Sequence, residues 1–206
     1  MTIQEEIHLL ETKLAATEDL KEQAEVILEI LKKLQSIKAN AEVTEPYIAK
    51  LEQLAKTLNT PKYKGWSLYF SAILKYRETA YDNASIYFEQ ALSIFQTINY
   101  RTGCSEVHNH WGYVYFAKSN YNMAMEHYQK ALDISVEDGD QKGISRGYID
   151  MGNLITRQGN YPVALQFHLK GLKIREELGD KKALSVSYQN LANVYALLSI
   201  MRKAFV

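Results

Sequence analysis

The chain has 206 residues, with 24 Lys or Arg and 24 Asp or Glu, so its formal net charge is zero. Its length is enough for a continuous core, and the balanced charge argues against attraction to nucleic acid or anionic lipid. One cysteine, Cys104, excludes an intramolecular disulfide, and we find neither a signal peptide nor a membrane-spanning stretch. We therefore expect a cytoplasmic protein with no nucleic-acid or membrane partner.

The hydrophobic pattern predicts helices throughout. Near the N-terminus, for example, Ile27, Ile30, Leu31 and Leu34 form one apolar stripe at helical spacing. No segment alternates with the period of a strand over a useful length. The fold class predicted is all-α, with helices in chain order near residues 3–15, 18–36, 43–58, 64–79, 82–98, 104–118, 121–136, 144–158, 161–177 and 184–198.

The later part of the chain repeats itself every 40 residues. Each unit contains a tyrosine followed three residues later by an alanine: Tyr81 and Ala84, Tyr121 and Ala124, Tyr161 and Ala164. Nine residues before each tyrosine comes a small residue, and a fourth unit continues the series: Ala72, Gly112, Gly152 and Ala192. Small residues inside helices indicate close helix crossings. Self-similarity at this period indicates a solenoid, in which units bury their apolar faces against neighbours.

These positions form a recognisable signature. The series Trp111-Gly112-x-x-Tyr115, Asn120-Tyr121-x-x-Ala124 and Tyr128-x-x-Ala131-Leu132 resembles the tetratricopeptide repeat. The usual repeat has about 34 residues; the 40-residue form is similar to that of bacterial signalling proteins, kinesin light chains and polarity adaptors. The resemblance covers residues 64–206 and departs at Lys75, where an aromatic is usual. It implies a right-handed superhelical solenoid of antiparallel helix pairs.

We expect the repeats to occupy residues 61–206, as units near 64–103, 104–143 and 144–183 and an incomplete one at 184–206. Residues 1–60 lack the signature, so they are a helical cap or a divergent repeat, and a cap is favoured because solenoid ends need cover. Residues 199–206 are interpreted as the start of another helix that stops early, leaving Leu197, Leu198, Met201 and Phe205 uncovered. This end indicates a longer chain, or completion by a partner or a second copy.

Catalytic and metal chemistry find little support. His108 and His110 lie two residues apart, which on a helix points them about 200° apart, so they cannot chelate one ion. Cys104 shares its repeat position with Ile144 and Leu184, which indicates packing. No phosphate-binding, hydrolase-elbow or zinc-protease motif occurs. The sequence predicts no enzyme active site, no metal and no cofactor within these residues.

The resemblance implies a concave groove lined by the first helix of each pair. In each unit the implied positions lie three or four residues apart, as a helical stripe requires. They are Trp66, Phe70, Ile73 and Arg77; Glu106, His110, Tyr113 and Ala117; Arg146, Asp150, Asn153 and Arg157; and Val186, Asn190, Asn193 and Leu197.

This predicted groove is aromatic at its start and polar later. Asparagine amides can hold a peptide backbone through a donor and an acceptor, and Arg146 and Arg157 can pair with carboxylates. We therefore predict an extended or helical peptide ligand, with an apolar anchor at one end. The alternative is that the polar residues are merely solvated and that the N-terminal helices cover Trp66 and Phe70.

The function predicted is a non-catalytic protein or peptide interaction module, acting as the N-terminal sensing or regulatory part of a bacterial signalling protein. One alternative is a free-standing adaptor or oligomeric scaffold that self-associates through its incomplete last repeat. Another is a receptor for a short signalling peptide, which would stabilise the protein by mass action.

Overall fold

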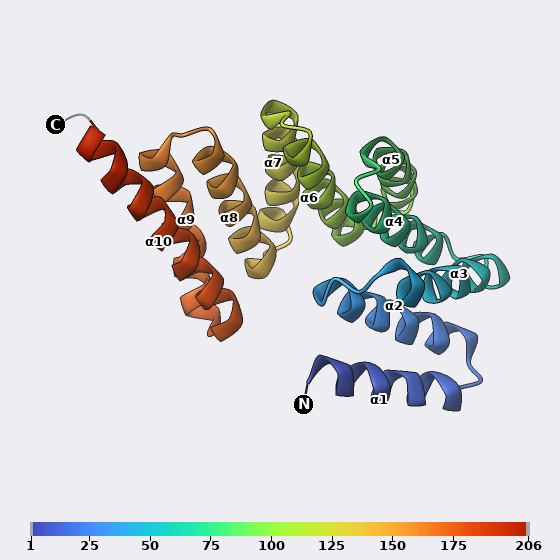
Figure 1. Ribbon diagram of the computed structural model, residues 1–206. Helices are drawn as coiled ribbons and strands as arrows, with labels where there is room; N and C mark the ends of the chain where they lie inside the picture. Colours follow the sequence, from blue (N-terminus) through green and yellow to red (C-terminus); the bar gives the residue numbers. More distant parts are fainter. Residues whose placement is uncertain (1, 205–206) are drawn as a thin grey trace. The chain divides into compact units, whose positions relative to one another are not determined.

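The computed structural model describes residues 2–204 and is built of helices, with no strand in that range (Figure 1). The helices are α1 (Ile3–Ala16), α2 (Leu20–Ser36), α3 (Ala41–Thr57), α4 (Pro61–Arg77), α5 (Tyr81–Thr97), α6 (Arg101–Ala117), α7 (Tyr121–Glu137), α8 (Gln141–Arg157), α9 (Tyr161–Leu178) and α10 (Lys181–Ala204). The all-α prediction is confirmed.

The sequence located these helices closely, with one error. Every predicted boundary lies within three residues of the observed one except the end of α10, which continues to Ala204. The new helix predicted from Ser199 is therefore wrong. Ser199 shares its repeat position with Ser119 and Gly159, which leave the helical region with positive φ. Since Ser119 adopts this conformation, the residue type alone does not explain why α10 continues through Ser199. Phe205 lies outside the described residues.

Left-handed residues end the helices at a regular spacing. From position 59 onward a residue with positive φ recurs every 20 residues: Asn59, Thr79, Asn99, Ser119, Gly139, Gly159 and Gly179. After α4, Thr79 N–H donates to the Tyr76 carbonyl at 3.0 Å, and Ala80 N–H donates to the Lys75 carbonyl at 2.9 Å. This is the Schellman arrangement, which satisfies carbonyls left open at a helix end. Short, repeated links of this kind explain the constant helix length.

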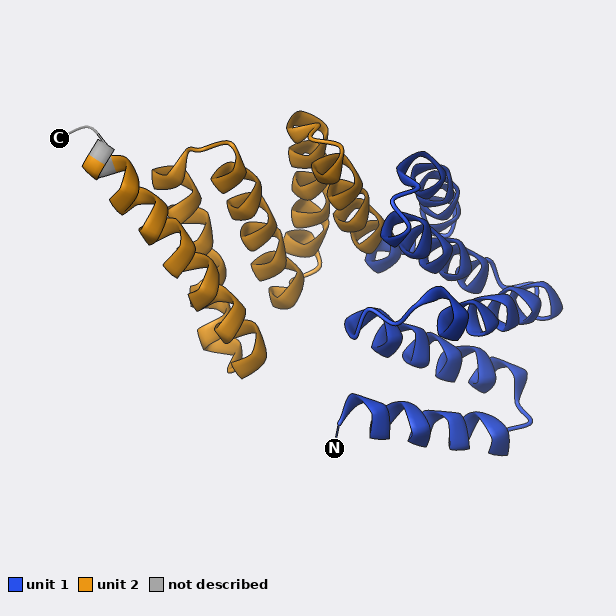
Figure 2. Cartoon of the chain, viewed as in Figure 1, with its two compact units in different colours: residues 1–103 blue, residues 104–206 orange. Residues whose placement is uncertain are grey.

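The chain divides into two compact units, residues 1–103 and 104–206 (Figure 2). The predicted boundary at residue 60 is a different division and stays a prediction. Helices α2 and α3 have 17 residues each, like α4 and α5, and pack against one another. This similarity favours a divergent repeat over a cap for residues 20–57.

Unit 1 has an aromatic interior. Six large rings of α4 and α5 are almost fully buried: Tyr63, Trp66, Tyr69, Phe70, Phe88 and Phe95. The Trp66 ring lies 5.1 Å from Tyr69 and 5.3 Å from Phe95, both edge to face. A smaller cluster, Val26, Ile30 and Leu34 of α2, receives apolar side chains from α1 and α3. Large buried rings supply most of the hydrophobic stabilisation of such a core.

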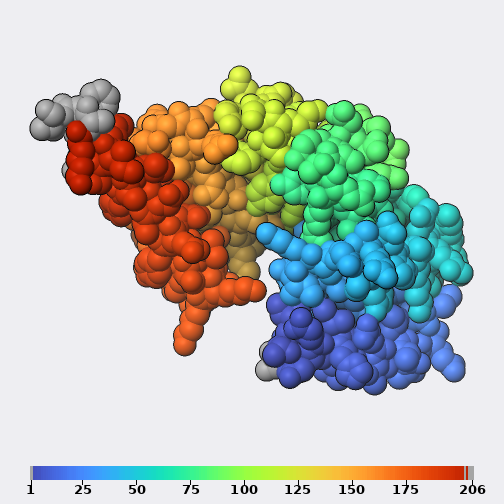
Figure 3. Space-filling model, viewed as in Figure 1, coloured from blue at the N-terminus to red at the C-terminus, as the bar shows by residue number. Residues whose placement is uncertain are grey.

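Unit 2 packs through small residues at its helix crossings. A Cβ built on Gly112 of α6 would lie 2.4 Å from the Tyr128 ring of α7, so only glycine allows this approach. A Cβ built on Gly152 of α8 would likewise lie 2.8 Å from the His168 ring of α9. The sequence singled out both glycines for this role. Figure 3 shows that side chains fill the space between neighbouring helices within each unit. Among residues 2–204 we find no helix with the length and apolarity to cross a bilayer.

Candidate ligand-binding site

The aromatic residues predicted to line a groove are in fact core residues of unit 1. Trp66 is 2% exposed and Phe70 is 1% exposed. The Lys32 ammonium of α2 lies 5.3 Å from the Trp66 ring centre, so α2 covers this side of α4. The prediction that these rings anchor a ligand is therefore wrong, and the alternative that the N-terminal helices cover them holds. Large rings gain more from burial against α2 than from solvent exposure.

Arg77 also has a structural role. Its guanidinium donates to the Gln35 carbonyl at 2.9 Å and to the Ala39 carbonyl at 2.8 Å. These carbonyls lie at the end of α2, where a cation meets unpaired acceptors and the negative end of the helix dipole. Burial lowers the pKa of Arg77. The side chain is thus engaged in holding α2 against α4.

Five predicted residues of α6 and α8 form a polar network inside unit 2. Arg146 makes a two-pronged ion pair with Glu106, at 2.7 and 3.1 Å. Tyr113 O–H and the Asn109 amide both donate to one carboxylate oxygen of Asp150, each at 2.8 Å. The His110 ring lies edge to face on Tyr113, 5.3 Å between ring centres. These side chains are fixed by one another.

Electrostatics in this network follow from its burial. Burial raises the pKa of Asp150, against the effect of its two donors and of Arg146. Burial also raises the pKa of Tyr113, and the Asp150 charge adds to the shift. Burial alone would lower the pKa of Arg146. The charge of Glu106 and its hydrogen bonds outweigh burial, so the pKa of Arg146 is raised. The sequence missed Asn109, because nothing in its repeat position marks it as a partner of Asp150.

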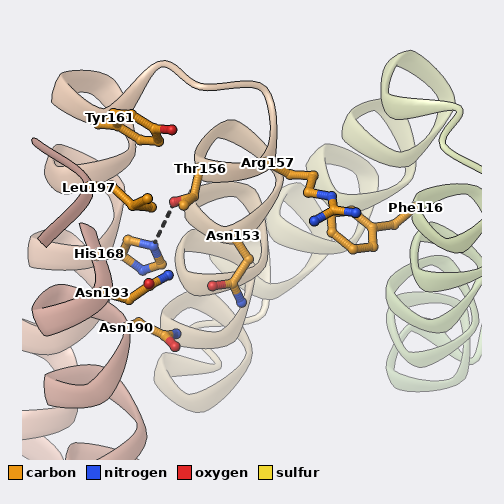
Figure 4. Close-up of a pocket in the computed structure, with 9 residues that line it drawn as sticks. All are labelled: Phe116, Asn153, Thr156, Arg157, Tyr161, His168, Asn190, Asn193 and Leu197. Atoms are coloured by element: carbon orange, nitrogen blue, oxygen red, sulfur yellow. Dashed lines mark hydrogen bonds between the residues drawn. The ribbon is translucent and has the colours of Figure 1, made fainter. Parts of the chain in front are cut away.

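The remaining predicted residues do come together. Asn153, Arg157, Asn190 and Asn193 line one pocket of about 370 Å³, with α8 contributing the first two and α10 the others. Ligand pockets start at about this size. Figure 4 shows the pocket with its further lining residues. These are Phe116, Thr156, Tyr161, His168 and Leu197.

The lining is polar, with amide groups on two neighbouring helices. Asn153 and Asn193 are exposed and Asn190 is half-buried, so their donors and acceptors are accessible. Arg157 is the only charged side chain on the pocket wall among the described residues, and together with Ser119 it lowers the pKa of Tyr121. The predictions missed Thr156 and His168. Both replace aromatic residues of earlier units, and a comparison of repeat positions would have revealed this.

Two histidines of α6 and α7 contact each other. Among residues 2–204 no group of three or more His, Cys, Asp or Glu side chains could hold an ion. His108 and His127 lie close together instead, with their Nδ1 atoms 3.1 Å apart. Both are buried, and the Trp111 ring centre lies 4.8 Å from that of His127. One imidazole donates to the other, which satisfies both nitrogens without a metal.

The helix hairpins and the close glycine crossings define a helical-repeat protein. Residues 103–177 match the tetratricopeptide repeat family model. The match confirms the family resemblance found in the sequence. The link to the 40-residue variant stays a prediction. No curated protein matches the chain.

Solved structures with the same fold cover nearly the whole chain. BtubC (BKLC) from P. vanneervenii is 18% identical, with a TM-score of 0.74 over 99% of this chain and 87% of its own. A signal transduction ATPase (STAND) protein with a tetratricopeptide repeat sensor, from Pyrococcus horikoshii, is 17% identical, with a TM-score of 0.68 over 94% of this chain. Aspartyl phosphate phosphatase F from Bacillus subtilis is 16% identical, with a TM-score of 0.72 over 93%. The chain spans 30% and 53% of the last two.

Proposed function

We propose that this chain is a non-catalytic interaction module that binds a peptide at the pocket between α8 and α10. The observation that supports this most is the gathering of three asparagine amides and one guanidinium, from Asn153, Asn190, Asn193 and Arg157, around one open pocket. Amides pair with peptide N–H and C=O groups regardless of peptide sequence. Arg157 adds a site for a carboxylate, either a side chain or a chain end.

Peptide selection with a matched control tests this proposal. A phage library of random heptapeptides is selected on the wild-type protein, and the enriched peptides are measured by fluorescence anisotropy. The test variant combines Asn153→Ala, Arg157→Ala and Asn190→Ala. The control combines Gln129→Ala, Gln166→Ala and Lys173→Ala, which are exposed on α7 and α9.

The expected result is a loss of affinity confined to the test variant. Three lost hydrogen bonds of about 1 kcal/mol each correspond to a roughly 100-fold weaker Kd. Circular dichroism of both variants establishes that they fold. Peptides held equally by all three proteins, or no enriched peptide at all, would contradict the proposal.

We further propose that the module is the cytoplasmic sensing or regulatory part of a bacterial signalling protein, in which a bound peptide shifts the balance between helix arrangements. The similarity to a STAND protein with a tetratricopeptide repeat sensor supports this role. The mass of the endogenous protein tests it. A product with an added output domain supports the proposal, whereas one ending at Val206 favours an adaptor or a free peptide receptor.

Self-association is a second candidate, supported by the exposed apolar residues of α10. Tyr188, Tyr195 and Ile200 are 53%, 54% and 65% exposed. Apolar side chains in such numbers on one helix are typical of interaction surfaces. Sedimentation equilibrium tests this, because a dimer that Tyr195→Glu and Ile200→Glu convert to a monomer supports the scaffold role, and a monomeric wild type contradicts it.

A further inference from the structure

At two repeat positions beside the pocket, the last complete repeat, residues 144–183, has smaller side chains than the repeats before it. At the first position, on the second helix of each pair, the series is Phe88, Tyr128 and His168. At the second, near the end of the first helix, the series is Tyr76, Phe116 and Thr156. Both His168 and Thr156 line the pocket. Smaller residues at these two points leave room that aromatic rings fill elsewhere.

His168 is a buried polar group beside this room. It is 1% exposed and lies over Gly152, as Tyr128 lies over Gly112. Burial lowers its pKa, and the nearby positive charge of Arg175 adds to this. The imidazole is therefore neutral at pH 7, with one nitrogen carrying a proton and the other an acceptor.

Thr156 decides which nitrogen carries the proton. Its hydroxyl donates to the Gly152 carbonyl at 2.8 Å, so its oxygen is left to accept from His168 Nε2, 3.5 Å away. Nε2 is then the protonated nitrogen, and Nδ1 carries a lone pair. No group among residues 2–204 hydrogen-bonds to His168 Nδ1. In Figure 4 this nitrogen lies on the side of the ring away from Thr156.

A buried hydrogen-bond acceptor without a donor destabilises the fold unless a ligand donates a hydrogen bond to it. We propose that the pocket is a specificity subsite for one uncharged amide side chain of the bound peptide, glutamine or asparagine, whose N–H donates to His168 Nδ1. This rests on the proposed peptide-binding function and adds the class of residue that the site selects. The amide oxygen of the ligand then faces the donors of the pocket asparagines.

The charges of the pocket select against other side chains. Arg157 repels a lysine or arginine, and no carboxylate lines the pocket within the described residues to offset that repulsion. A carboxylate would pair with Arg157 but has no proton to give Nδ1. An apolar side chain would leave Nδ1 and the asparagine amides unpaired, which costs affinity. A neutral amide satisfies both the donors and the acceptors.

Nitrogen NMR of the histidine rings tests the subsite without any peptide. The protein is labelled with ¹⁵N-histidine and titrated with acetamide, which mimics the amide side chain, and with N,N-dimethylacetamide, which lacks the N–H. We expect an unprotonated Nδ1 on His168 in the free protein. Acetamide should shift its resonance, as a new donor does, and N,N-dimethylacetamide should leave it unchanged.

Two variants provide the matched controls. His168→Tyr and Thr156→Phe introduce the side chains that the preceding repeat, residues 104–143, holds at the same positions as Tyr128 and Phe116. Both variants should therefore fold. The Asn190 and Asn193 side-chain amides report the pocket in these variants, and acetamide should no longer shift them. A protonated Nδ1 in the free protein, equal shifts with both amides, or unchanged binding in both variants would overturn the inference.

The peptide selection separates this inference from the proposed function. Peptides enriched on the wild type should share a glutamine or asparagine, and its replacement by leucine should weaken binding about tenfold, the value of a hydrogen bond to a buried group. Peptides that bind the wild type and His168→Tyr equally would leave the binding function intact and refute the subsite. An acetamide response without any enriched peptide would keep the subsite and refute peptide binding.

Discussion

Units 1 and 2 repeat the same helix pairs but fill equivalent positions with opposite chemistry. Position 66 of unit 1 is a buried tryptophan, and its equivalent in unit 2 is Glu106, paired with Arg146. Phe70 is buried in unit 1, whereas its equivalent in the next repeat is His110. Of the eleven buried polar residues found among residues 2–204, only Thr44 and Ser67 belong to unit 1.

This difference shows how one repeat serves two purposes. Burial of the rings at these positions stabilises unit 1 by about 25 cal/mol per Å² of apolar surface. The Trp66 indole N–H is nevertheless buried without a hydrogen-bond partner among residues 2–204. Polar groups there contribute little net energy and require complete pairing. Pairing in unit 2 is incomplete at several buried atoms, among them Asn109 Oδ1, Arg175 Nε and His168 Nδ1. Of these three residues, only His168 lines the pocket. The proposed binding pocket thus lies in the unit with the less apolar interior.

The largest expected effect comes from Trp66→Ala in unit 1. Removing this ring leaves a cavity among Tyr69, Phe70 and Phe95 and should lower the free energy of unfolding by about 3–5 kcal/mol. The equivalent change in unit 2, Glu106→Ala, removes a half-buried ion pair and should cost about 1–3 kcal/mol. Urea unfolding followed by circular dichroism measures both. Equal losses would contradict the contrast between the two interiors.

Acid should weaken unit 2 before unit 1, because the close imidazole pair lies in unit 2. Burial and the charge of His127 lower the pKa of His108 to about 4, and burial and Lys130 lower that of His127 to about 4. Both values lie below the unfolded value of 6.5. The neutral pair therefore stabilises the fold above pH 6.5, and this contribution is lost as the pH falls toward 4. One pKa unit corresponds to about 1.4 kcal/mol, so the loss reaches about 3 kcal/mol for each imidazole.

Hydrogen exchange at pH 7 and pH 4.5 locates this loss along the chain. Amides of α6 and α7 should lose protection in acid while those of α4 and α5 keep it. The control variant combines His108→Leu and His127→Phe, which copies Leu68 and Phe167 from the equivalent positions. It should lose most of the acid sensitivity of α6 and α7. An unchanged pH dependence in this variant would assign the effect to other groups.

The sequence predicted the helices well because periodicity and small residues report local geometry directly. Gly112 and Gly152 marked crossings that the structure contains. The asparagines predicted to line a long groove lie at one pocket between α8 and α10. The errors concern tertiary burial. Nothing in the pattern of α4 shows that α2 covers Trp66, because that contact joins segments more than 30 residues apart. The Asn109–Asp150 bond was missed for the same reason.

The smallest expected effect concerns the left-handed residues that end the helices. Thr79 in unit 1 holds φ of 61°, whereas Gly159 occupies the equivalent position in unit 2 with φ of 84°. A β-branched residue in this region costs about 1–2 kcal/mol. Glycine avoids that cost but loses about 0.5–1 kcal/mol through the greater freedom of the unfolded chain. Thr79→Gly should therefore stabilise the protein by about 0.5–1 kcal/mol, and Gly159→Thr should destabilise it by a similar amount.

Asn99→Gly is the matched control for this exchange, because asparagine tolerates the left-handed region better than threonine does. Its stabilising effect should be smaller than that of Thr79→Gly, and urea midpoints at constant slope would rank the three variants. A lower urea midpoint for Thr79→Gly would show that Thr79 is not strained. Steric strain would then not distinguish the helix ends of unit 1 from those of unit 2. The threonine would then contribute to the native state through its side chain, and the contrast would rest on the two interiors alone.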